Sequence, residues 1–90
     1  MALSMSELAG ARELAASLLE DLGLEAYLFE VEPRDEHWEL VVECAVAQGW
    51  ETVRLVVDRR ALNDARDDPD HRRRLLQEWG TRLAACRREP

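Results

Sequence analysis

Four residues have side chains of the types that bind zinc or react as nucleophiles. They are His37, His71, Cys44 and Cys86. They form neither a Cys-x-x-Cys pair nor a closely spaced pair of histidines, so the pattern of a zinc site is missing. Each cysteine lies on the apolar face of an expected element, where a free thiol behaves as a small hydrophobic group. We therefore expect two buried, reduced cysteines that react slowly with a bulky thiol reagent, and neither a metal site nor a disulfide.

Carboxylates are the second set of candidate chemical groups. Glu30, Glu39 and Asp58 share one face of the expected sheet, where three carboxylates could bind a divalent cation or act as general acid and base. Carboxylates on flat neighbouring strands seldom converge on one ion, and an open sheet face offers no pocket that excludes water. The sequence also lacks a glycine-rich phosphate loop and a nucleophile elbow. We expect a protein that is not an enzyme and has no cofactor and no metal.

The arginines are gathered in the second half of the chain. Residues 1–51 hold twelve acidic residues and two arginines, whereas residues 52–90 hold seven acidic residues and ten arginines. Such asymmetry favours self-association of unlike faces, or a partner that is steered to one face, over an evenly charged surface. An ordinary solvated surface is the alternative. Because the acidic half repels phosphates, binding of nucleic acid over the whole surface is disfavoured.

Length and composition indicate one small globular domain that spans residues 1–90. The chain is 47% apolar and 34% charged, which is typical of a folded protein and not of a disordered one. Its apolar runs are too short to cross a bilayer, and its first residues lack the basic and apolar segments of a signal peptide. We therefore expect a cytoplasmic protein that does not bind membranes.

The positions of apolar residues predict a helix at each end of the chain. Ser4 and Glu7 have the spacing of a capping box, an apolar arc extends from Leu8 to Leu22, and Gly23 suits the end of this helix. Near the other end, Asp58 can cap a short helix over residues 59–66. Asp68 and Pro69 suit the start of a final helix whose apolar face includes Leu75, Leu76, Trp79, Leu83 and Cys86.

Between these helices, three segments alternate apolar and polar residues with a period of two. Their inner faces begin at Tyr27, Trp38 and Val53, and short turns at residues 33–36 and 48–49 join them. Two short connections in succession indicate an antiparallel meander. The sequence therefore predicts an α+β fold of order α-β-β-β-α(α), in which the helices pack on one face of a three-stranded antiparallel sheet.

This order of elements resembles the layout of double-stranded RNA-binding domains. The basic start of the last helix in those domains has a loose counterpart in Arg72, Arg73 and Arg74. Their glycine-rich approach to that helix is replaced here by the acidic segment Asp64–Asp70. The likeness is one of layout only, and the arginines have acidic residues of their own chain as their nearest candidate partners.

The two turns also predict which residues face each other across the sheet. If residues 48–49 form the second turn, Val42 faces Leu55 and Glu43 faces Arg54; if the first turn joins Glu32 to His37, Phe29 faces Leu40. On the outer face this register aligns Leu28, Val41 and Val56 in an apolar row, with Trp50 beyond it. It also aligns Glu30, Glu39 and Asp58 in a row of like charges, which costs stability unless a partner compensates.

These rows give the leading functional hypothesis, a small accessory, regulatory or inhibitory protein that binds a protein partner or a second copy of itself. The expected contact residues are Leu28, Glu30, Glu39, Val41, Trp50, Val56 and Asp58. The alternative is a nucleic-acid-binding module that uses the arginine-rich second half. A third hypothesis is a decoy whose carboxylates imitate phosphates.

Overall fold

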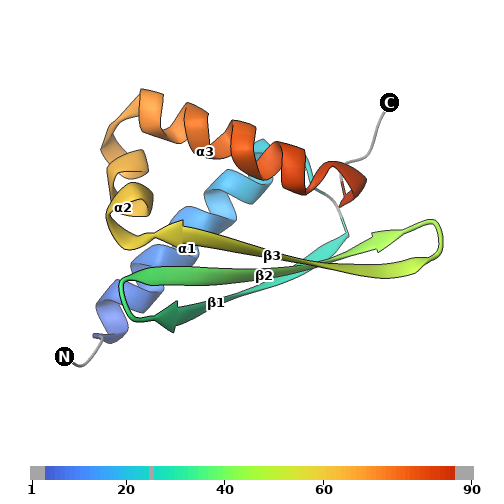
Figure 1. Cartoon of the computed structure of the whole chain (residues 1–90), viewed down its shortest axis with the longest axis horizontal. Coiled ribbons are helices and arrows are strands. Elements are labelled where there is room, and N and C mark those ends of the chain that lie inside the picture. The colour runs from blue at the N-terminus through green and yellow to red at the C-terminus, as the bar shows by residue number, and fades with distance from the viewer. Residues whose placement is uncertain (1–3, 25, 87–90) are drawn as a thin grey trace.

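The order of elements agrees with the sequence-based prediction. The computed structural model describes residues 4–24 and 26–86, which form three helices and one open antiparallel sheet with the strand order β1-β2-β3 (Figure 1). The elements are α1 (Met5–Asp21), β1 (Tyr27–Arg34), β2 (His37–Val46), β3 (Gly49–Asp58), α2 (Arg59–Asp67) and α3 (Pro69–Arg82), followed by a 3-10 turn, η1 (Ala84–Cys86). Helix α1 crosses one face of the sheet, and α3 extends along the side of β3 (Figure 1). No described helix is long and apolar enough to cross a membrane.

A side-chain cap begins α1 and a glycine follows its end. The hydroxyl oxygen of Ser4 accepts a hydrogen bond from the backbone N–H of Glu7 at 3.0 Å and donates one to the Glu7 carboxylate at 3.3 Å. At the other end, Gly23 has a φ of +80°, a conformation that residues with a Cβ rarely adopt. The predicted N-cap at Ser4 and the predicted glycine stop are confirmed, whereas the Glu7 carboxylate accepts from the Ser4 hydroxyl and not from the Ser4 backbone N–H, as it would in a full capping box.

Two aspartates begin the remaining helices. The carboxylate of Asp58 accepts from the N–H groups of Arg60 and Ala61 at 2.8 and 3.3 Å, which satisfies donors that have no partner inside the first turn of α2. Asp68 caps α3 in the same way through the N–H of Asp70, and Pro69 occupies the first turn. The chain can therefore turn sharply between α2 and α3 without leaving backbone groups unpaired.

The cross-strand register differs from the prediction by two residues at both turns. Val42 faces Val53 and not Leu55, and Phe29 faces Val42 and not Leu40. The second turn consists of residues 47–48, because Gly49 is the first residue of β3, where its φ of +132° favours glycine. A shift of two residues leaves every side chain on the same face, so the predicted faces are right and the predicted partners are wrong.

The core lies between the inner face of the sheet and the three helices. The central strand contributes Trp38, Leu40, Val42 and Cys44, all of which are buried. Helix α1 adds Leu18 and Leu19, α2 adds Leu62 and Ala65, and α3 with the residues after it adds Leu75, Trp79 and Leu83. Among the described residues every buried side chain is apolar, so burial of hydrophobic surface is the main stabilising force.

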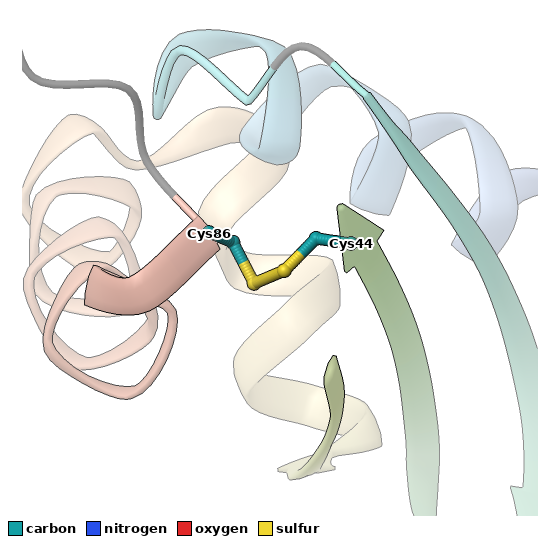
Figure 2. The surroundings of a disulfide bond; sticks show 2 residues. All are labelled: Cys44 and Cys86. Carbon is teal, nitrogen blue, oxygen red and sulfur yellow. A yellow bond between two sulfur atoms is a disulfide. The ribbon is translucent and has the colours of Figure 1, made fainter. Parts of the chain in front are cut away.

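Cys44 and Cys86 form a disulfide, which contradicts the prediction of two free, reduced cysteines (Figure 2). Their Cα atoms lie 5.6 Å apart, although 42 positions separate them in the sequence. The prediction that both side chains are buried is confirmed, but it treated them separately, and the fold brings β2 and η1 together at one place in the core. By the chain-entropy model, closing a loop of this length stabilises the folded state by about 4 kcal/mol.

Truncation of the central strand tests the assignment of the inner face. Leu40→Ala and Val42→Ala should each lower the free energy of unfolding by about 2–4 kcal/mol, because each leaves a cavity in the core. Chemical denaturation measures this loss. Val56→Ala, on the exposed face of β3, is the control and should change stability by less than about 0.5 kcal/mol. A loss below about 1 kcal/mol for both core variants would mean that the two faces are assigned in reverse.

The disulfide is tested by counting thiols. Protein purified without reductant and unfolded in denaturant should show no free thiol, and two after reduction. Reduction should also lower the free energy of unfolding by about 2–4 kcal/mol. The double variant Cys44→Ala and Cys86→Ala is the control, because reductant should leave its stability unchanged. Two thiols in the unreduced protein would contradict the bond.

Candidate partner-binding face

The sheet has one face that the helices leave open, which we call the outer face. It consists of the outward side chains of the three strands: Leu28, Glu30, Glu32 and Arg34 of β1; His37, Glu39, Val41, Glu43 and Ala45 of β2; and Trp50, Thr52, Arg54, Val56 and Asp58 of β3. All seven residues expected to contact a partner lie on this face. Their period-two spacing placed them there, and the two-residue change of register does not move them to the other side.

The predicted apolar row is not formed. Val41 faces Glu30 on β1 and Arg54 on β3, so charged side chains flank it. Leu28 faces Glu43, and Val56 faces Glu39. The apolar and charged residues therefore alternate across the strands, because each cross-strand register differs from the predicted one by two residues.

The predicted row of like charges is not formed either. Glu39 lies between two arginines: its carboxylate oxygens are 3.0 Å from Nη2 of Arg34 and 3.7 Å from Nη1 of Arg54. Its side chain is only 20% exposed, so these cations offset part of the cost of removing it from water. Arg34 also reaches Glu32 at 3.0 Å. The carboxylates of the predicted row are thus compensated in part by arginines of the same face.

Glu43 lacks its predicted partner, whereas Asp58 has its predicted role as a helix cap and does not join a row of like charges. Glu43 was expected to pair with Arg54, but it faces Thr52 instead. Asp58 lies at the end of β3, and its carboxylate caps α2. Glu30 and Glu43 therefore remain as the carboxylates of the outer face that neither pair with an arginine nor cap a helix within the described residues.

Large hydrophobic side chains are exposed on the outer face. Leu28, Trp50 and Val56 are 65%, 64% and 65% exposed, and Val41 between them is half-buried. Trp50 lies near the β2–β3 turn, opposite Ala45, and Val56 lies six residues further along β3. Exposed hydrophobic side chains thus occur near both ends of β3. Carboxylates of the outer face lie between these side chains and the β1 edge of the sheet.

No described part of the structure has the geometry of a metal centre. No group of three or more His, Cys, Asp or Glu residues gathers within residues 4–24 and 26–86. The three candidate ligands Glu30, Glu39 and Asp58 are separated by the observed register, and two of them are engaged by arginines or by a helix cap.

The arginines at the start of α3 are largely used within the chain. Arg72 binds the hydroxyl of Ser17 at 2.9 Å and the carboxylate of Asp21 at 2.5 Å, which joins α3 to α1. Arg73 pairs with Asp70 at 3.1 Å. The prediction of an acidic partner in the nearby segment Asp64–Asp70 is confirmed for Arg73, whereas Arg72 pairs with Asp21 of α1.

Sequence reasoning missed two contacts of α2, one with β2 and one with α1. The guanidinium of Arg59 lies over the ring of Trp38, 4.8 Å from its centroid, and Nη2 of Arg66 donates to the carbonyl oxygen of Gly10 at 3.4 Å. A Cβ at position 10 would come within 3.1 Å of that nitrogen. The signal in the sequence was a glycine in the interior of a helix. Glycine lowers helix stability there, so its presence indicates a close approach by another group.

Comparison of the chain with models of protein families, with curated proteins and with solved structures finds no match. The likeness to double-stranded RNA-binding domains therefore stays one of element order.

Proposed function

We propose that this chain is a non-enzymatic protein-binding module that contacts its partner through the outer face. One observation carries this proposal. Of the four large hydrophobic side chains that are exposed in the described residues, three lie on the outer face and the fourth, Met5, lies at the start of α1. Hydrophobic residues gathered on one exposed face are a common mark of an interaction surface.

The polar groups of the outer face define the chemistry of the partner. Glu30 and Glu43 make no ion pair with another described residue and lie beside Val41 and Leu28, their cross-strand neighbours. A partner with lysine or arginine next to an apolar side chain would match this arrangement. A second copy of the chain is one such partner, and a different accessory or regulated protein is another.

The hypothesis of nucleic-acid binding has less support. Arg72 and Arg73 pair with aspartates, Arg66 binds a backbone carbonyl, and Arg59 packs on the ring of Trp38, so these four guanidinium groups are in contact with other parts of the molecule. The decoy hypothesis is weakened by Arg34 and Arg54, which interrupt the carboxylates of the outer face. A cytoplasmic location remains a prediction, and the disulfide weighs against it because such bonds are rare in the cytosol.

Charge insertion at the centre of the outer face tests the proposal. Val41→Lys should change the stability of the isolated chain by less than about 1 kcal/mol, because Val41 is half-buried and faces Glu30. In a complex that covers this face, the same lysine would be buried without a full set of partners, which weakens association at least tenfold. Met5→Lys adds the same charge to an exposed apolar site away from the sheet and is the matched control.

The measurement is the molar mass by light scattering, with thermal unfolding as the check on folding. A wild-type oligomer that Val41→Lys dissociates and Met5→Lys preserves would establish self-association through the outer face. If all three proteins are monomers, each is used to capture binding proteins from the native host, and the captured proteins are compared. A partner that is lost with Val41→Lys alone supports the proposal, and equal retention by all three variants overturns it.

A further inference from the structure

The backbone of β3 has a free side that a further strand could use. The N–H of Ala45 donates to the carbonyl of Ala26 at 2.9 Å, so the odd-numbered residues of β2 bond to β1 and the even-numbered residues bond to β3. Because hydrogen-bonding direction alternates along a strand, the backbone groups of Thr52, Arg54 and Val56 point away from β2. The sheet ends at β3, so these groups form an open edge.

One of these edge groups already has a donor, and the donor comes from α3. Nη2 of Arg82 donates to the carbonyl oxygen of Arg54 at 2.9 Å. Within the described part of the chain, Arg82 is the single side chain that hydrogen-bonds to the backbone of this edge. A flexible, exposed guanidinium thus occupies the position that the N–H of a neighbouring strand would take.

A groove of about 400 Å³ separates this edge from α3. Figure 1 shows α3 along the open side of β3, with no strand beyond it. Leu55 and Val56 line the groove on the strand side. Glu78, Trp79, Thr81 and Arg82 line it on the helix side. Val56 belongs to both this groove and the outer face, but the other lining residues are separate from the proposed partner-binding face.

We propose that the groove binds an extended acidic peptide, which adds a fourth strand to the sheet beside β3. Backbone hydrogen bonds to Thr52, Arg54 and Val56 would supply affinity, as in other complexes in which a peptide extends a sheet edge. The side chains of such a peptide alternate, so one set faces α3 and the other continues the outer face.

The acidic character of the peptide follows from Arg82, which lines the groove, and from Arg54, which lies on the adjoining edge strand. When a peptide N–H takes the carbonyl of Arg54, the guanidinium of Arg82 loses its acceptor and needs another. A carboxylate is the best available acceptor for a guanidinium because the bond is charge-assisted. The groove is lined by one acidic residue, Glu78, and Arg54 adds a second cation beside the edge, because its side chain is 61% exposed and its guanidinium lies 3.7 Å from the Glu39 carboxylate.

A second copy of the chain fits this edge less well. Antiparallel pairing of two β3 strands about a two-fold axis would place both α3 helices on the same side of the joined sheet. Each α3 already lies alongside the open edge (Figure 1), so the two helices would compete for the space next to β3. A single extended peptide has no such helix.

The test is an NMR titration of ¹⁵N-labelled protein with a capped synthetic peptide, Thr-Val-Glu-Val-Glu-Val-Thr. The amide signals of Thr52, Arg54, Val56 and Thr81 should shift most. Arg82→Gln should weaken binding at least fivefold, because the freed guanidinium and its ion pair are lost. Arg12→Gln, which removes an exposed arginine of α1, is the matched control and should leave binding unchanged.

Two altered peptides separate the hydrogen bonds from the charge. Replacing both glutamates with lysine should weaken binding at least tenfold, and N-methylation of alternate amides on the side that bonds to β3 should abolish it. Equal binding by either altered peptide, or no shifts at millimolar peptide, overturns the proposal. Shifts of the same amides with protein concentration alone would mean that a second copy occupies the edge, which also overturns it.

The result is independent of the function proposed for the outer face. Val41→Lys should not weaken peptide binding, since Val41 does not line the groove and the added lysine would lie beside Arg54, which increases the positive charge near this edge. Arg82→Gln should likewise leave the molar mass and the retained partner unchanged. The two proposals can therefore fail independently, because the variant that tests one should not reduce the signal measured for the other.

Discussion

The rest of the structure depends on burial of one face of the central strand. Trp38, Leu40, Val42 and Cys44 alternate with polar or half-exposed residues, so β2 has one side that must leave water and one that need not. The edge strands β1 and β3 extend the sheet on either side of β2, and the three helices pack against its apolar face. Because all the described helices cover the same face, the opposite face has only its own side chains to screen it from solvent.

Two consequences of this one-sided packing bear on function. The first is the outer face, where Arg34 and Arg54 neutralise Glu39 while Leu28, Trp50 and Val56 remain exposed. The second is the edge of β3, where α3 lies alongside the strand but meets its backbone through Arg82 alone within the described residues. A face offers area and hydrophobic contact to a folded partner, whereas an edge offers hydrogen bonds to an extended one. The two proposals therefore concern partners of different shapes.

The disulfide shows how local predictions combine in three dimensions. Burial of Cys44 followed from the alternation of β2, and burial of Cys86 followed from the apolar face of the last helix. Neither pattern contains the distance between the two residues, which depends on how the C-terminal segment returns to the far end of β2. The bond then connects the central strand β2 to the turn η1 at the end of the described chain, across 42 positions of the sequence.

The sequence by itself determined the elements, their caps and their faces, because these depend on neighbours within a few positions. Ser4, Gly23, Asp58 and Asp68 mark boundaries that the structure confirms, and all seven candidate contact residues lie on the expected face. Tertiary structure alone decided the cross-strand partners, the disulfide and the groove beside β3. A two-residue change of register leaves every side chain on the same face but changes its cross-strand partner. The alternation of side chains therefore cannot distinguish the two registers. Distances between segments far apart in the chain are likewise settled only when all the layers pack together.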